Sequence, residues 1–181
     1  MHADASPVFP LTKAQRGLWV ANKLHTDNTL MLAEVLEMFG PLNPQVLIRA
    51  SMQLTHEFDT LRLCIVEREG VPSQVVLPEY NGAIPYFDVS SDPAPRNAAE
   101  HWIDEEIRKP EDLQNGPLWH CAVFRLGEDH HLWVQCVSHL VMDGYCASVM
   151  MQRMAVLYNA YVADMEPEPA QYGSALSLLE M

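Results

Sequence analysis

The sequence predicts an α/β domain in which helices alternate with mainly antiparallel strands. Helical and strand-like patterns follow one another along the chain, and no internal repeat is present. Two pairs of strand-like segments are each joined by a connection short enough for a hairpin, which is typical of antiparallel pairing. The chain has 181 residues, of which 49% are hydrophobic and 19% charged, so it has the size and composition of one globular domain.

The first half of the chain carries clear helix-start signals. Thr12 and Gln15 have the spacing of a capping box, which begins a helix that ends near Leu24. The pair Asn43–Pro44 predicts a second helix, because asparagine caps a helix well and proline has no amide proton to lose at the first position. Residues 30–39 fit a strand or a helix by periodicity, and we expect a strand because a Gly-Pro pair ends the segment before this second helix.

The rest of the chain continues the alternation. Residues 61–78 resemble a hairpin of two segments rich in β-branched residues, and a helix is expected over 95–109. The segments 117–126 and 131–140 are mostly apolar and are joined by a short polar connection, which predicts a hairpin whose strands are buried on both faces. A long final helix is expected over 145–163.

Charge and cysteine usage exclude several functions. The net charge is −13, and no basic cluster is present, which argues against a nucleic acid or an anionic membrane as the partner. The four cysteines stand singly in apolar segments without metal-ligand spacing, as expected of buried thiols in a reducing compartment. No signal peptide and no membrane-spanning stretch is evident, so a cytoplasmic location is expected.

His139 is the candidate for chemistry. In an extended strand from residue 131, His139 shares a face with Trp133 and Gln135, while Ser138 points to the opposite face. Asp143 then stands where the strand gives way to the last helix, whose first amides form a positive pole that could stabilise an oxyanion. The alternative is structural, because a histidine at a strand end is commonly a packed residue and an aspartate before a helix is commonly an N-cap.

Three segments resemble the first three signature motifs of condensation domains of nonribosomal peptide synthetases, in the same order. They are LTKAQRGLW (11–19), EFDTLRL (57–63) and SHLVMDG (138–144), the last written HHxxxDG in the family. The resemblance covers nearly the whole chain and implies a fold similar to chloramphenicol acetyltransferase. That fold is a two-layer sandwich in which a mixed, mainly antiparallel sheet packs against helices, and a second similar lobe completes the domain.

The resemblance also implies roles for named residues. It makes His139 the catalytic residue, and it makes Asp143, Arg62, Gly144 and Ser138 structural residues of the active site. Asp143 is expected to pair with Arg62 across the lobe, with a simple N-cap as the alternative. Ser138 stands where the family has its first histidine, a position that the resemblance implies to be structural.

The expected division of the chain follows from the same resemblance. Residues 1–164 are the N-terminal lobe, and residues 165–181 are a linker that begins the crossover to a missing C-terminal lobe. The implied partners are peptidyl or aryl carrier proteins, the missing lobe and downstream synthetase domains. No cofactor or metal bound by this chain is expected, since the substrates are thioesters on the phosphopantetheine arms of the carriers. If Met1 is the natural start, the donor carrier arrives in trans.

The expected reaction is amide formation between a donor acyl or peptidyl thioester and an acceptor aminoacyl thioester. The lone lobe is expected to be inactive. Three alternatives stay open: an epimerisation-type domain, another HxxxD acyltransferase that acts on a free small molecule, and a catalytically silent lobe that only docks carriers. The cyclisation type has aspartate in place of the first motif histidine, and Ser138 disfavours it.

Overall fold

The structure is a computed structural model that describes residues 7–24 and 30–170. Every helix and strand predicted from the sequence is present, with ends that differ by one or a few residues. The elements are, in chain order, β1 (Val8–Pro10), α1 (Lys13–Leu24), β2 (Met31–Phe39), α2 (Pro44–Glu57), the 3-10 helix η1 (Asp59–Arg62), β3 (Leu63–Arg68), β4 (Val71–Val76), β5 (Tyr86–Asp88), α3 (Pro95–Arg108), β6 (Trp119–Gly127), β7 (His130–Ser138) and α4 (Gly144–Val162).

The predicted helix-start signals form as expected. The Thr12 amide donates to Gln15 Oε1 at 3.0 Å, and the Gln15 amide donates to Thr12 Oγ1 at 3.2 Å, which completes the capping box. Asn43 Oδ1 accepts hydrogen bonds from the first free amides of α2, at Gln45 and Val46. Both caps satisfy backbone donors that have no partner inside their helix.

The larger sheet has four strands in the order β2-β7-β6-β5. The pairs β2–β7 and β7–β6 are antiparallel, whereas the short β5 runs parallel to β6. The predicted α/β class with a mixed, mainly antiparallel sheet is therefore confirmed. The central strands β6 and β7 are almost entirely buried, as their apolar composition predicted.

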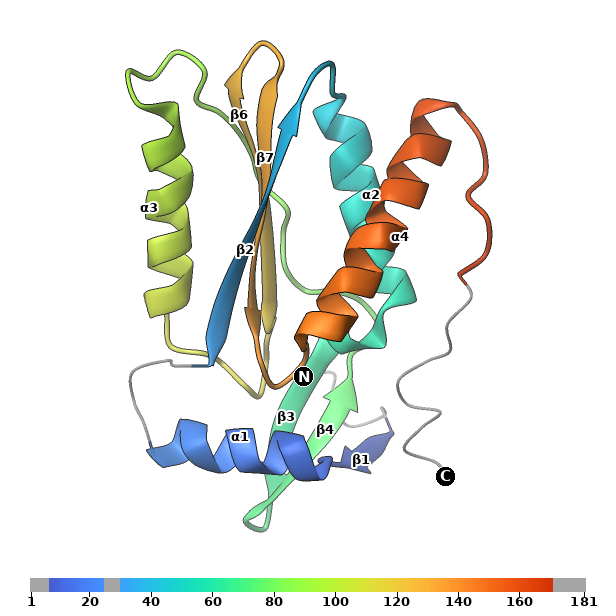
Figure 1. Cartoon of the computed structure of the whole chain (residues 1–181). Helices are drawn as coiled ribbons and strands as arrows, with labels where there is room; N and C mark the ends of the chain where they lie inside the picture. The colour runs from blue at the N-terminus through green and yellow to red at the C-terminus, as the bar shows by residue number, and fades with distance from the viewer. Residues whose placement is uncertain (1–6, 25–29, 171–181) are drawn as a thin grey trace.

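Helices cover both faces of this sheet (Figure 1). Trp133 and Val137 of β7 pack in the main hydrophobic core with residues of α2 and α4. Leu132 and Val134 point to the other face and pack in a second cluster with Ala99 of α3. The alternation predicted for β7 is thus confirmed, because successive side chains of a strand point to opposite faces.

A second, three-stranded sheet has the order β1-β4-β3. The β3–β4 hairpin turns at Glu69 and Gly70, both with positive φ, which suits the right-handed twist of the two strands. This sheet and α1 lie together at the end of the molecule where α4 begins (Figure 1). The small sheet and α1 therefore stand next to the segment that carries His139.

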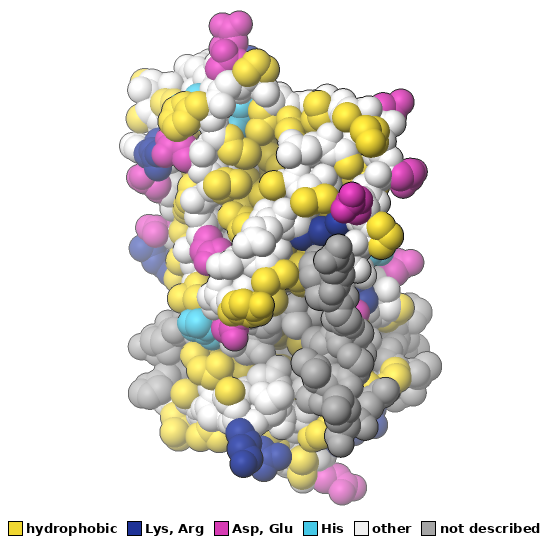
Figure 2. Space-filling view, turned by 45° about the vertical axis from the view of Figure 1, so that its right-hand side comes forward, with side chains coloured by type: hydrophobic (Ala, Val, Ile, Leu, Met, Phe, Trp, Pro, Cys, Tyr) yellow, Lys and Arg dark blue, Asp and Glu magenta, His cyan; other side chains and the backbone are white. Residues whose placement is uncertain are grey.

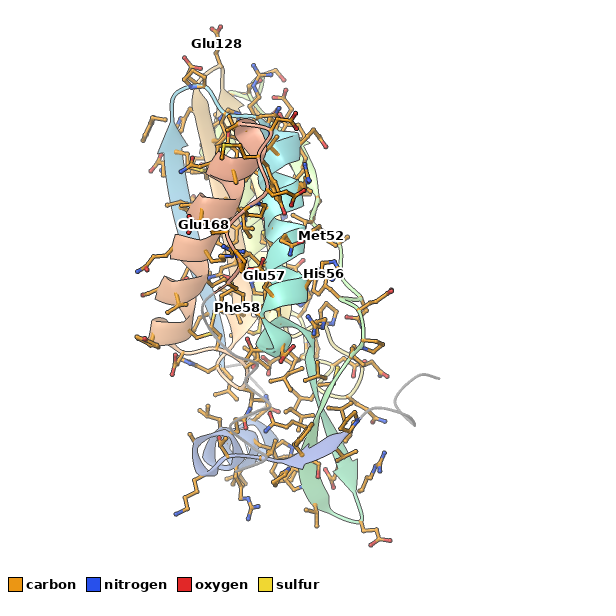
Figure 3. The ribbon with its side chains drawn as sticks, turned by 90° about the vertical axis from the view of Figure 1, so that its right-hand side faces the viewer. Met52, His56, Glu57, Phe58, Glu128 and Glu168 are labelled. Atoms are coloured by element: carbon orange, nitrogen blue, oxygen red, sulfur yellow. The ribbon has the colours of Figure 1, made fainter. Side chains whose placement is uncertain are left out.

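A buried ion pair joins α4 to α2. Arg153 of α4 donates from Nε to Glu57 Oε2 at 2.6 Å and from one terminal nitrogen to Glu57 Oε1 at 2.8 Å. Its other terminal nitrogen donates to the Glu168 carbonyl oxygen at 2.7 Å, so the segment after α4 is held against the same two helices. Figure 3 shows Glu57 and Glu168 on this side of the molecule. Residues 171–181 of the expected linker lie outside the described part of the chain.

Candidate active site

His139 follows directly after the last residue of β7. Its backbone amide donates to the Leu30 carbonyl oxygen at 2.8 Å, so the pairing of β7 with the β2 side continues one residue beyond the strand. The side chain is partly exposed, in contrast to the fully buried residues before it. The end of the strand therefore presents an imidazole at the edge of the core instead of packing it inside.

The imidazole of His139 has one hydrogen-bond partner among the described residues. Its Nδ1 lies 3.2 Å from the carbonyl oxygen of Met142, three residues further on. A carbonyl oxygen can only accept, so Nδ1 carries the hydrogen in this contact. In the neutral ring, Nε2 then has a free lone pair and can accept a proton.

Asp143 is the N-cap of α4. Its Oδ1 accepts a hydrogen bond from the Cys146 amide at 2.8 Å, and its backbone is extended, as is usual for this position. Within the described chain, the preceding amides of Gly144 and Tyr145 have no hydrogen-bond acceptor. These two donors and the positive end of the helix lie a few residues from His139, where they can stabilise a negative charge on an oxygen.

The predicted ion pair between Arg62 and Asp143 is wrong. The Arg62 guanidinium instead pairs with Asp59 at 2.9 Å. It also donates to the carbonyl oxygens of Thr55 and His56 at the end of α2, and to that of Leu77 at 3.0 Å. The guanidinium therefore directs its hydrogen bonds to these four residues and not to Asp143. Asp143 instead caps its own helix, which was the alternative expected from the sequence.

Ser138 and His139 have different neighbours, as their opposite directions along the strand require. Ser138 is fully buried, and its hydroxyl accepts a long hydrogen bond of 3.4 Å from the Leu140 amide. The same hydroxyl lies near the carboxyl group of Glu111, in the segment after α3. Burial raises the pKa of Glu111, and the neighbouring Ser138 and Asn22 only partly offset this rise.

Sequence reasoning missed two residues beside this site, Gln15 and Glu111. The sequence indicates Gln15 as part of a capping box and of the first family motif, and its Nε2 also donates to the Leu140 carbonyl oxygen at 3.0 Å. Glu111 stands in a polar loop sequence that suggests full exposure, but its Oε1 atom is buried without a hydrogen bond of normal geometry. No local signal could reveal either contact, because each joins segments far apart in the chain.

The described residues offer few other sites. They contain no group of three or more His, Cys, Asp or Glu side chains that could hold a metal ion. In the part of the chain that is described, no helix is both long and apolar enough to cross a membrane. On the face drawn in Figure 2, lysine and arginine side chains form small separate groups among acidic and apolar ones.

Comparison with known proteins assigns this chain to a family. The family model described as "Condensation domain" matches residues 5–173. A dimodular nonribosomal peptide synthase of Bacillus subtilis is 32% identical over 173 residues, which are 95% of this chain and 7% of that protein.

Solved structures give the same result. The starter condensation domain of rhizomide synthetase superimposes with a TM-score of 0.89 at 30% identity, over 97% of this chain and 44% of that one. A mutant of that domain, solved in complex with C8-CoA, has the same TM-score and identity and is covered to 40%. This chain belongs to the condensation-domain family, as its motifs predicted, and it spans less than half the length of these solved relatives.

Proposed function

We propose that this chain is the N-terminal lobe of a condensation domain that forms an amide bond between two carrier-bound substrates. The observation that carries the proposal is the His139 side chain. It lies in the segment SHLVMDG, which resembles the family motif HHxxxDG, and its Nδ1 is held by the Met142 carbonyl oxygen, which leaves Nε2 able to accept a proton. Within the described chain, the amides of Gly144 and Tyr145 at the start of α4 have no acceptor, and they follow His139 by five and six residues.

The reaction can be followed atom by atom. The acceptor amine attacks the carbonyl carbon of the donor thioester, so a C–N bond forms and the carbonyl oxygen becomes an oxyanion. Nε2 of His139 accepts or orients the proton that the amine loses, while amides at the start of α4 stabilise the oxyanion. The intermediate then collapses, the C–S bond breaks, and the proton passes to the departing thiolate to give a thiol.

The proposed partners follow from this chemistry. Both substrates are thioesters on the phosphopantetheine arms of carrier proteins, and this chain itself binds no cofactor. The complex of a relative with C8-CoA supports an acyl thioester as the donor. Holding two thioesters beside one histidine supplies much of the rate enhancement through proximity. We propose further that this lobe works together with a second lobe and with carrier domains, and that the protein is cytoplasmic.

The test is a condensation assay with the full-length synthetase that contains this chain. The donor carrier is loaded with an acyl thioester and the acceptor carrier with an aminoacyl thioester, and the products are identified by mass spectrometry. We expect the amide on the acceptor carrier, and none when the acceptor carrier lacks its amino acid. An epimerised acceptor without amide would support the epimerisation type, and acyl transfer to a free amine without carriers would support another HxxxD acyltransferase.

A further inference from the structure

Gln15 of α1 contacts the turn that carries His139. Its Nε2 donates one hydrogen to the Leu140 carbonyl oxygen at 3.0 Å and the other to Gln74 Oε1 at 3.0 Å. Its Oε1 accepts from the Thr12 amide, also at 3.0 Å. Because both amide hydrogens and the oxygen have partners, the side chain is fixed in one orientation.

The contact is anchored in the small sheet. Gln74 of β4 is only 2% exposed, and its Nε2 donates to the Pro10 carbonyl oxygen of β1 at 2.9 Å. A continuous line of hydrogen bonds therefore runs from the β1 backbone through Gln74 and Gln15 to the backbone of the turn. The buried Gln74 amide is costly to leave unpaired, so this line of hydrogen bonds opposes a shift of the turn away from α1.

The turn is the part of the site that needs such support. Residues 139–143 lie between the end of β7 and the start of α4 and belong to neither element. His139 is oriented by the Met142 carbonyl oxygen of the same turn, so the direction of its ring depends on the backbone between the two residues. Leu140 follows His139 directly, and its carbonyl oxygen is the atom that Gln15 holds.

A second contact joins α1 to the same region. Asn22, seven residues after Gln15 and so on the same face of α1, donates from Nδ2 to Glu111 Oε2 at 3.0 Å. Glu111 lies near the hydroxyl of Ser138, the residue that precedes the turn. No residue of α1 is fully buried, and these polar contacts add to the packing of Leu18 and Trp19 against the main core.

We propose that Gln15 is a positioning residue of the reaction, which holds the His139 turn in its working conformation. The proposal rests on the function proposed for His139. It gives the glutamine of the first motif a role in catalysis that is separate from its role in capping α1.

Two substitutions separate these roles in the full-length synthetase. Gln15→Glu keeps an oxygen that can accept from the Thr12 amide but cannot donate to Leu140, whereas Gln15→Met removes both the donor and this acceptor without adding charge. The matched control is Thr12→Ala, which weakens the cap and leaves the Nε2 contact in place. We expect kcat for amide formation to fall about tenfold in both Gln15 variants, with the KM for the loaded acceptor carrier unchanged and kcat normal in Thr12→Ala.

Thermal unfolding of all three variants is recorded beside the rates. Parent kcat in both Gln15 variants overturns the proposal, as does a fall in kcat that Thr12→Ala shares at equal stability. His139→Ala in the same assay keeps the two claims apart. If that variant is inactive while the Gln15 variants work normally, only the positioning role fails, whereas parent activity of His139→Ala refutes the proposed function itself.

Discussion

The Nδ1 atom of His139 is held by the backbone carbonyl oxygen of Met142, at 3.2 Å. The partner that orients the imidazole is therefore not a carboxylate. A backbone carbonyl selects the tautomer with hydrogen on Nδ1, just as an aspartate would, but it adds no full negative charge beside the ring. Asp143, the acidic residue of the motif, is engaged with the first turn of α4 instead.

The separation of Asp143 from Arg62 has a measurable consequence. Asp143→Ala should cost about 1 kcal/mol of unfolding free energy, the usual loss for an N-cap. Arg62→Ala should cost about 3 kcal/mol, because the Arg62 side chain is only 11% exposed and its loss removes a largely buried ion pair with Asp59. Since the two residues have separate partners, the double mutant measured by denaturant unfolding should show additive effects within about 0.5 kcal/mol.

Asp143→Asn is the matched control, since asparagine caps a helix as well as aspartate does. This variant should keep near-parent stability and activity. A coupling energy well above 1 kcal/mol between positions 62 and 143 would show that the two residues interact, and would contradict the separate partners assigned to them.

The ion pair between Arg153 of α4 and Glu57 of α2 should contribute strongly to the stability of the folded chain. Both side chains are largely buried, so Arg153→Ala removes a buried ion pair with the Glu57 carboxylate and should cost about 3 kcal/mol. Arg108→Ala, which removes an exposed pair with Asp104 on α3, should cost less than about 0.5 kcal/mol. Chemical denaturation of both variants measures the loss of unfolding free energy. Equal losses in the two variants would contradict the difference in burial between the two ion pairs.

Arg153 also fixes the segment after α4 through the Glu168 carbonyl oxygen. Hydrogen exchange at residues 165–170 should therefore accelerate in Arg153→Ala and stay unchanged in Arg108→Ala. Unchanged exchange in both variants would show that the segment is held by other contacts.

Glu111 predicts a pH dependence of stability. Burial raises its pKa above the ordinary value of 4.5, so between these two values the folded protein holds a proton that the unfolded chain has lost. The contribution of Glu111 is fully present below pH 4.5 and is lost as the pH rises through the folded pKa. In Glu111→Gln this term is absent, so the variant should gain stability relative to the parent as the pH rises from 4.5 towards neutrality.

Denaturant midpoints measured across this pH range test the sign. A stability difference between Glu111→Gln and the parent that does not change with pH, or that moves in the opposite direction, would contradict the raised pKa.

Much of the fold could be predicted because its signals are local. Capping at Thr12 and Asn43 and the two-residue period of β7 each depend on neighbouring residues only. The assignment of β3 and β4 to a separate small sheet could not be predicted, because strand pairing is decided by contacts between distant segments. The same limit applies to the site. The alternation gave the direction of His139, but the partners of Arg62 and Gln15 depend on which segments the folded chain brings together.

The most direct test of the proposed function compares His139→Ala with Ser138→Ala in the full-length synthetase. Loss of a positioned proton-transfer group should lower the rate of amide formation from loaded carriers roughly a hundredfold or more in His139→Ala. Ser138→Ala should stay near the parent rate, since its hydroxyl faces away from the imidazole, lies near the Glu111 carboxyl group and accepts a long hydrogen bond from the Leu140 amide. A His139→Ala protein that unfolds at the parent temperature and joins its carrier-bound substrates at the parent rate would contradict the catalytic role of His139.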